Sequence, residues 1–265
     1  MMRVFIDGIG LLGPGLNGWS DSITSLRGDK TYLAEPTVIK SSNMLPAAER
    51  RRAGVPIKLA LAVGQEALQQ SVHNLKTTAT VFTSSGGDND NVHAINSILA
   101  TAPHELSPTR FHNSVHNAAA GYWCIAAETH EPSTSLCAFD SSFAAGLLES
   151  ATQVSVDKSV VALIAYDHPY PEPMSKIRPI TAAFAMALVL APQQSAHSLA
   201  SMDVEFVTGN TPDSTMRTAS LEALRLGVPA ARGLPLLAAL ARGESAQLNI
   251  GYLADNTLKI RLTPC

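Results

Sequence analysis

Two short stretches of this sequence are apolar at almost every position. Residues 159–166 read SVVALIAY, and residues 182–191 read AAFAMALVLA. A strand with one face in water alternates apolar and polar side chains, so a strand that is apolar throughout must be covered on both faces. The second stretch also fits a buried helix, but it is too short to cross a bilayer. The sequence therefore predicts a sheet covered by helices on both sides.

Strand-like and helical patterns alternate along the chain, which predicts an α/β fold. Strands are predicted at residues 4–6, 78–83, 135–139 and 159–166, and helices at 19–26, 56–68, 92–99, 118–127 and 143–154. Gly28 is placed to end the first helix. The last part of the chain predicts a strand at 204–207, helices at 218–226 and 234–240, and an antiparallel hairpin of 247–251 with 258–262 across Asp255 and Asn256.

Three glycines, Gly8, Gly10 and Gly13, follow the first apolar strand. Glycine tolerates the positive φ that tight turns require, so the strand is predicted to run into a turn there. The spacing matches the G-x-G-x-x-G pattern of dinucleotide binding. However, Pro14 and Gly15 follow at once, and no second apolar strand ends in an acidic residue at the expected distance. We therefore predict no cofactor.

Two motifs resemble parts of metal sites. His112 and His116 are four residues apart, which on a helix would place both imidazoles on one face. Pro108 and the polar surroundings favour an extended loop instead, and no third ligand accompanies the pair. Residues 88–91 (DNDN) resemble part of a calcium loop but lack its glycine and closing Glu, so an ordinary turn and helix cap is predicted. The sequence predicts no metal site.

Net charge and cysteine content exclude further classes of protein. A net charge of −3 gives no electrostatic footprint for nucleic acid. The only basic run, Arg50-Arg51-Arg52, lies beside Glu49 and is predicted to be a solvated surface. Three cysteines cannot all pair within the chain, and the first residues lack a long apolar stretch after a basic one. A cytoplasmic protein without a membrane span is predicted.

Several segments, in the same order, resemble the first half of a β-ketoacyl synthase, a thiolase-like condensing enzyme of fatty-acid and polyketide synthesis. Residues 3–14 (RVFIDGIGLLGP) resemble its opening strand and turn, and residues 83–87 (TSSGG) its glycine-rich loop. Residues 111–123 (FHNSVHNAAAGYW) resemble its interface loop and following small-residue helix. With residues 143–149 (FAAGLLE), this last segment resembles a short ketosynthase-like family of aryl-polyene-type biosynthetic clusters.

The resemblance implies a thiolase-like layered fold with a truncated second half. Residues 1–192 would form the ketosynthase-like N-terminal half, and residues 193–265 a shortened segment that completes the fold. In the family, two catalytic histidines come from motifs of the second half. Neither motif is present here, and His197 is the only histidine after Leu190. Without these imidazoles, the carbanion formed by decarboxylation of a malonyl unit has no stabiliser.

The nucleophile is also missing from its expected place. Condensing enzymes use a thiolate at the N-terminus of a buried helix, where the helix dipole lowers its pKa. Alignment of residues 139–150 with the family motif places Asp140 at the cysteine. A carboxylate is a poor acyl acceptor from a thioester. Cys137 lies three residues earlier, where strand alternation predicts a buried structural cysteine.

The resemblance therefore implies a non-catalytic chain length factor, with no catalytic residue of its own. It would form a heterodimer with a full-length ketosynthase and meet an acyl carrier protein through that complex. The residues expected to contact the partner and to limit chain length are Phe111, His112, Asn113, Ser114, Val115, His116, Asn117 and Phe143.

Two other functions stay open. One is a small acyltransferase or thioesterase that uses Cys137 or Ser141 as nucleophile with His112 or His116 as base. The other is a structural stabiliser that never touches the growing acyl chain. Covalent acylation would identify the enzyme, whereas both non-enzymatic functions require a partner.

Overall fold

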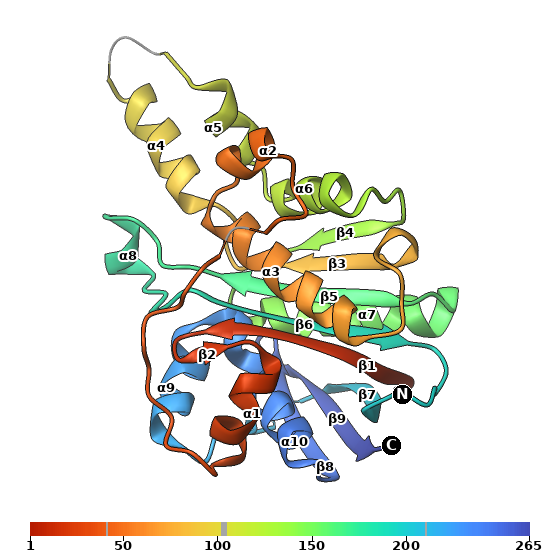
Figure 1. The fold of residues 1–265 in the computed structure, drawn as a ribbon. Coiled ribbons are helices and arrows are strands. Elements are labelled where there is room, and N and C mark those ends of the chain that lie inside the picture. Colours follow the sequence, from red (N-terminus) through yellow and green to blue (C-terminus); the bar gives the residue numbers. More distant parts are fainter. Residues whose placement is uncertain (41, 102–104, 210) are drawn as a thin grey trace.

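The computed structural model describes residues 1–40, 42–101, 105–209 and 211–265. Within them the strands form one mixed sheet with the order β4-β3-β5-β6-β1-β7-β9-β8, and β2 pairs with β1 (Figure 1). The strands are β1 (Met2–Gly13), β2 (Leu16–Asn17), β3 (Ala79–Thr83), β4 (Ser133–Leu136), β5 (Val161–Asp167), β6 (Phe184–Ala191), β7 (Ala200–Thr208), β8 (Ala246–Tyr252) and β9 (Asn256–Pro264).

Helices cover both faces of the central strands. The α-helices are α1 (Trp19–Arg27), α2 (Ala47–Arg52), α3 (Val55–Gln70), α4 (Asn89–Leu99), α5 (Pro108–Asn113), α6 (Ala118–Ala127), α7 (Ser142–Asp157), α8 (Met174–Ile177), α9 (Ala219–Gly227) and α10 (Leu234–Arg242). The 3₁₀ turns in the described residues are η1 (Leu75–Thr77), η2 (Phe139–Ser141) and η3 (Pro229–Gly233). No helix in the described ranges is long and apolar enough to cross a membrane.

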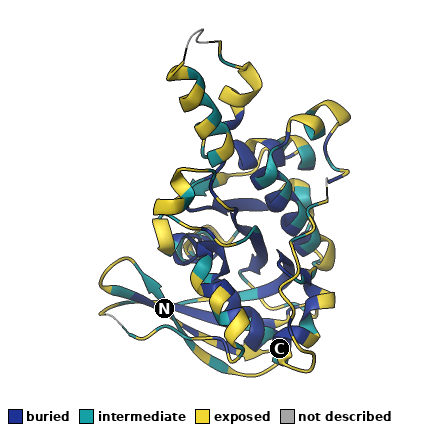
Figure 2. Ribbon diagram, turned by 90° about the vertical axis from the view of Figure 1, so that its left-hand side faces the viewer, coloured by how far each residue is buried: buried dark blue, intermediate teal, exposed yellow. Residues whose placement is uncertain are grey.

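The all-apolar strands lie where their sequence predicts. Both β5 and β6 are buried at every position. Alternate side chains of β5 enter two different cores: Leu163 packs on the α7 and α10 side, and Ile164 on the α3 and α6 side. Figure 2 shows these strands in dark blue at the centre of the molecule. Because β6 runs antiparallel to both β5 and β1, the sheet is mixed, whereas β4 and β5 both run parallel to β3.

The turn predicted after the first strand forms at Pro14 and Gly15, once β1 ends at Gly13, but not at the first two glycines. Gly8 and Gly10 lie inside β1 and have no positive φ. A Cβ atom at Gly10 would lie 2.7 Å from the carbonyl carbon of Val63, and one at Gly8 would lie 3.1 Å from that of Ala67. Both contacts are with the backbone of α3. These glycines are therefore required for the close approach of a helix to a strand rather than for a turn.

The last third of the chain extends the same sheet. β7 pairs with the start of β1, and the predicted hairpin forms between β8 and β9, with its turn at residues 253–255. The junction predicted between residues 192 and 193 lies directly after β6. One hydrophobic core joins the two sides of this junction, since Phe143 and Leu236 belong to the same cluster.

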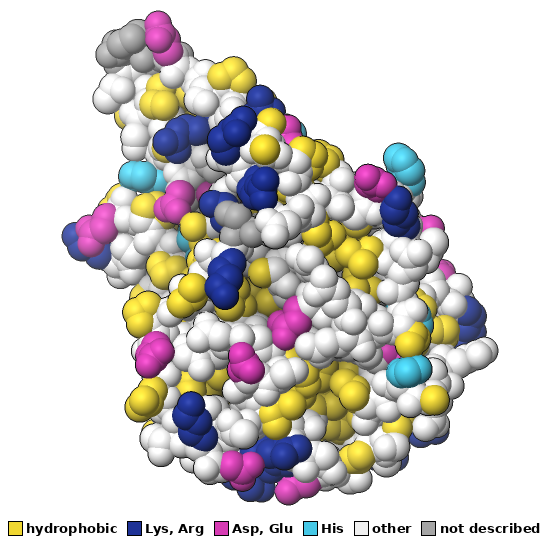
Figure 3. Space-filling model, viewed as in Figure 1, with side chains coloured by type: hydrophobic (Ala, Val, Ile, Leu, Met, Phe, Trp, Pro, Cys, Tyr) yellow, Lys and Arg dark blue, Asp and Glu magenta, His cyan; other side chains and the backbone are white. Residues whose placement is uncertain are grey.

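An arm formed by α4 and α5 projects from the body (Figure 1), and much of its surface is exposed in Figure 2. The sequence predicts an extended loop around Pro108, but this residue begins α5 instead. The nitrogen of proline has no hydrogen to donate, so the first position of a helix accommodates it, and Ser107 caps the backbone N–H of Arg110. Lys and Arg side chains gather over α2 and α5 in Figure 3, and Arg51 and Arg52 are exposed, as predicted.

Candidate active site and partner surface

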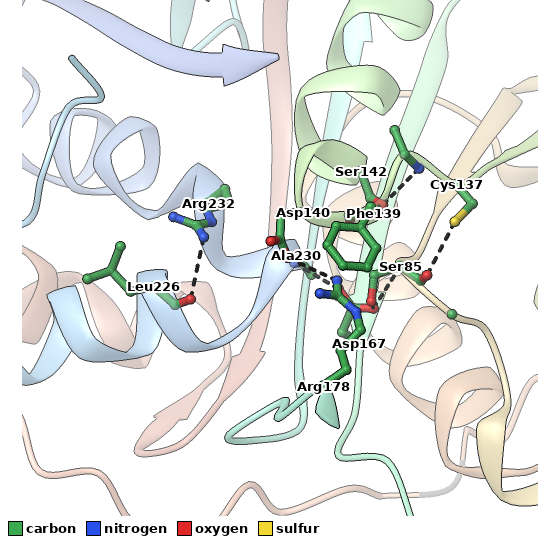
Figure 4. A network of polar contacts seen from close by, with 12 residues as sticks. Ser85, Cys137, Phe139, Asp140, Ser142, Asp167, Arg178, Leu226, Ala230 and Arg232 are labelled. Carbon is green, nitrogen blue, oxygen red and sulfur yellow. Dashed lines mark hydrogen bonds and ion pairs between the residues drawn. The ribbon is translucent and has the colours of Figure 1, made fainter. Parts of the chain in front are cut away.

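Three parallel strands end side by side, so the segments that follow them meet at one edge of the sheet. Residues 84–87 follow β3, residues 137–141 follow β4, and His168 follows β5. Polar and reactive groups on such segments converge because the carboxyl ends of parallel strands share an edge. Figure 4 shows Ser85, Cys137 and Asp167 together at this place.

Asp167 connects the segments. This buried carboxylate accepts hydrogen bonds from the backbone N–H of Ser85 at 2.8 Å, from Ser85 Oγ at 2.7 Å and from Ser84 Oγ at 3.2 Å. Its second oxygen accepts the N–H of Ala230 in η3 at 2.9 Å. Burial raises the pKa of Asp167 to about 6, although these donors act in the opposite direction. Sequence reasoning missed this residue, and its only signal was an acidic side chain that ends an apolar strand.

Phe139 and Asp140 lie in η2, the 3₁₀ turn that leads directly into α7. Phe139 has a positive φ of 53°, a strained conformation at the turn from strand to helix. Asp140 follows in η2, and its Oδ1 accepts a hydrogen bond from Nη2 of Arg178 at 2.9 Å. The same guanidinium lies 3.4 Å from the centre of the Phe139 ring (Figure 4). One arginine thus binds both side chains of the turn.

The predicted burial of Cys137 is wrong. β4 ends at Leu136, so Cys137 lies in the loop after the strand and is exposed. Strand alternation no longer fixes its side chain once the strand has ended. Its Sγ donates a hydrogen bond to the carbonyl oxygen of Ser85 at 3.2 Å. The thiol therefore lies at the edge of the site, where reagents can reach it.

Of the predicted bases, only His116 reaches this edge. Its Nε2 lies 3.1 Å from the carbonyl oxygen of Ser84, one residue from the carbonyl that Cys137 binds. His112 instead packs edge-on against Tyr122, with ring centres 6.0 Å apart. Ser141 Oγ accepts the N–H of Leu253, 3.0 Å away. The structure brings Cys137 and His116 to neighbouring carbonyls but leaves His112 and Ser141 in other contacts.

The remaining predicted partner residues divide into exposed and buried groups. Phe111 is 64% exposed and Val115 is 49% exposed, so both present apolar surface. Ser114 donates to the carbonyl of Phe111 at 2.8 Å, and Asn117 precedes α6. Asn113 is buried.

Asn113 and Phe143 have structural contacts inside the chain. The side chain of Asn113 donates to the carbonyl of Arg52 at 2.8 Å and accepts from Tyr122 at 3.1 Å. Phe143 is fully buried in the core on α7. Its ring is so close to Gly233 that a Cβ there would lie 2.7 Å from Cε2. The surface of the isolated chain therefore includes neither side chain.

The only histidine of the last segment, His197, lies at the other end of the sheet. The backbone N–H of Leu199 binds the carbonyl of Ile6, and Ile6 pairs with Leu190. Leu190 in turn pairs with Val161 at the start of β5, whereas the site begins at Asp167, where β5 ends. This span corresponds to about 20 Å of strand. His197 is exposed there and does not approach the start of α7.

Comparisons with known structures agree on the fold. A ketosynthase (ApeO) in complex with its chain length factor (ApeC) from Xenorhabdus doucetiae aligns with a TM-score of 0.74 at 22% identity, over 98% of this chain and 100% of that chain. The ishigamide ketosynthase/chain length factor gives 0.73 at 16% identity, over 100% and 99%. A β-ketoacyl synthase from Burkholderia phymatum gives 0.70 at 10%, over 100% of both chains.

Sequence comparison identifies the family. No curated protein matches the sequence. The family model described as "Beta-ketoacyl synthase, N-terminal domain" matches residues 25–246, a range that contains the whole site from Ser84 to Ala230. The chain therefore belongs to the β-ketoacyl synthase N-terminal domain family.

Proposed function

We propose that this chain is a non-catalytic chain length factor that forms a heterodimer with an active ketosynthase in polyene, polyketide or fatty-acid-like biosynthesis. Residues 1–192 provide the ketosynthase-like half, and residues 193–265 complete the fold. An acyl carrier protein delivers acyl units to the pair, and the aryl-polyene type of chemistry is the nearest resemblance. The three cysteines are unpaired, which suits the cytoplasm.

The observation that carries this proposal is the occupied start of α7. A condensing enzyme needs a thiolate there and imidazoles nearby to stabilise the carbanion. In this chain Asp140 is bound by Arg178, and Phe139 lies under the same guanidinium. His197, the last segment's only histidine, lies at the far end of the sheet. The positions of the family's cysteine and of its second-half histidines therefore carry other residues, which supports a non-catalytic function.

The edge strand β4 supports a partner. It is the outer strand of the described sheet, beside β3. The carbonyls of Pro132 and Leu136 accept hydrogen bonds from the β3 side. Because backbone groups alternate along a strand, those of Ser133 and Ser135 point away from β3. Unpaired N–H and C=O groups of this kind are a template for a strand of another chain.

The stretch from Phe111 to Asn117 supplies the second contact. Its apolar side chains, Phe111 and Val115, are exposed, so a partner that covered them would gain buried apolar surface. His116 anchors the stretch to the loop after β3. In the heterodimer, Val115 and His116 would contact the partner's acyl tunnel and limit the chain length. Larger or smaller residues at Val115 should then shift product length with little loss of binding.

The heterodimer is tested by blocking the edge of β4. We expect Ser135→Pro to remove one outward N–H without changing the β3–β4 ladder. The matched control is Gln247→Pro on β8, the opposite edge, where the N–H also points away from the neighbouring strand, as those of Asn249 and Gly251 do. After co-expression with a ketosynthase, size-exclusion chromatography should show the heterodimer for wild type and Gln247→Pro but not for Ser135→Pro. Equal complex formation by both variants would contradict pairing through β4.

The exposure of Cys137 favours one alternative, an acyltransferase or thioesterase. Its thiol and the imidazole of His116 bind neighbouring carbonyls, a juxtaposition that could form a nucleophile and base. Intact-protein mass spectrometry after incubation with acyl thioesters separates the two functions. A stable acyl adduct lost in Cys137→Ser would support the enzyme, and the absence of any adduct would support the chain length factor.

A further inference from the structure

A second group of ligating side chains lies where α4 begins. Asp88 caps α4, Asp90 lies in its first turn, and His168 follows β5. One ligand atom from each residue lies within 4.8 Å of the other two. The sequence separates His168 from the acidic pair by nearly 80 residues, so only the fold brings the three together.

The imidazole of His168 has an unsatisfied polar atom. His168 is 4% exposed, and its buried Nε2 has no hydrogen-bond partner among the described residues. Its Nδ1 lies 3.9 Å from Oδ2 of Asp90, which is too far for a hydrogen bond. Neither ring nitrogen therefore has a hydrogen-bond partner among the described residues, and an ion bound at Nδ1, the nitrogen nearest Asp90, would provide one for its lone pair.

The distances leave room for an ion between these groups. Zinc binds imidazole nitrogen and carboxylate oxygen at about 2.0–2.2 Å, so two ligands at the tetrahedral angle lie about 3.4 Å apart. The Nδ1–Oδ2 distance of 3.9 Å is longer by about 0.5 Å, which a small rotation of one side chain would remove. The Asp90 side chain is 56% exposed and can rotate toward an ion.

Hydrogen bonds also orient the carboxylate of Asp88 as a metal ligand. Its Oδ1 accepts the backbone N–H of Asn91 at 3.1 Å, and its Oδ2 accepts the side-chain amide of Asn91 at 2.7 Å. Hydrogen bonds of this type orient the carboxylate ligands of metal ions. Gly54 leaves space for the carboxylate, since a Cβ there would lie 2.5 Å from Oδ2.

We propose that Asp88, Asp90 and His168 bind one divalent transition-metal ion, such as Zn²⁺ or Mn²⁺. One imidazole with two carboxylates suits these ions better than Ca²⁺ or Mg²⁺, which prefer oxygen ligands alone. The ion would connect the base of the arm to the end of β5, because Asp90 belongs to α4 and His168 follows β5 directly. Its structural effect would be to fix the arm relative to the sheet.

Metal titration of the full chain tests the site. The protein is stripped with a chelator and titrated with Zn²⁺ by calorimetry in a Cys137→Ser, Cys265→Ser background, because exposed thiols also bind zinc. Mn²⁺ is titrated into the wild-type chain and followed by electron paramagnetic resonance. We expect one ion per chain and a higher melting temperature with metal. Asp90→Asn should weaken binding at least about tenfold and remove the thermal shift.

The controls separate a site from adventitious binding. Asp90 is exposed and makes no described hydrogen bond, so Asp90→Asn should fold normally even if a His168→Gln variant does not. Asp29→Asn and His130→Gln remove an exposed carboxylate and an exposed imidazole elsewhere, and both should leave the affinity unchanged. Equal affinity of Asp90→Asn and wild type, no stoichiometric binding, or tighter binding of Ca²⁺ or Mg²⁺ would each overturn the proposal.

Discussion

Because α3 packs closely against β1, the addition of a single methyl group to β1 should lower the stability of the fold substantially. In Gly10→Ala the new Cβ would lie 2.7 Å from the carbonyl carbon and 3.0 Å from the Cα of Val63. Both atoms belong to the backbone, so no side-chain rotation can relieve the overlap, and α3 must move away from β1. Overpacking of a core typically costs 1–3 kcal/mol, and this rigid contact lies at the upper end, at about 3 kcal/mol. The melting temperature should fall by about 6–12 °C.

The matched control is Gly121→Ala in α6. A Cβ at Gly121 meets no atom within 4 Å, and alanine is the better helix former, so this variant should gain about 0.5–1 kcal/mol. Urea unfolding followed by circular dichroism measures both free energies of unfolding. A loss below about 1 kcal/mol for Gly10→Ala would refute the close-approach explanation, because the helix would then have room to spare.

Three further predictions concern the site. Because burial raises the pKa of Asp167 from 3.8 to about 6, its contribution to stability is present at low pH and is lost as the pH rises through 6. The free energy of unfolding of wild type relative to Asp167→Asn should therefore fall by about 2–2.5 kcal/mol between pH 4 and 7, and a constant difference in urea titrations would contradict this. Maleimide labelling of the native chain should modify Cys137, as peptide mass spectrometry would report; protection equal to that of a buried thiol would contradict its placement. Asp140→Cys alone should give no condensation product in a malonyl-carrier-protein assay, because the thiol returns without the imidazoles, and robust product would reveal a hidden base.

Most of the fold follows from periodicity in the sequence. The all-apolar runs at β5 and β6 predict a doubly covered sheet, and Gly28 ends α1 in the left-handed conformation as expected. Local sequence patterns give a wrong prediction where a contact between distant segments determines the backbone conformation. The spacing of Gly8 and Gly10 fits either a tight turn or a strand that a helix approaches closely. Only the position of α3 in the folded chain shows which of the two is present. Pro108 fits both an extended loop and the first turn of a helix.

The candidate site is only partly readable from the sequence. The family motif places Asp140 near the start of α7, and the structure adds that Arg178 binds it from a distant loop. The exposure of Cys137 depends on where β4 ends, which sequence patterns locate poorly. Asp167 acquires its hydrogen-bond partners only when β3, β5 and η3 come together, and His168 meets Asp88 and Asp90 only in the folded chain. Interactions between residues far apart in the chain have no local signature, and these are the ones that sequence reasoning missed.

The central claim, that this chain does not catalyse condensation but supports a partner that does, is tested by reconstitution. Release of CO₂ from malonyl-carrier protein and formation of extended product are measured for the pure chain, for a ketosynthase alone, and for the co-purified pair. We expect no decarboxylation by the pure chain, because Asp140 and Phe139 occupy the start of α7 and His197 lies at the far end of the sheet. Extended product should appear only with the pair. Steady decarboxylation by the pure chain would contradict the account.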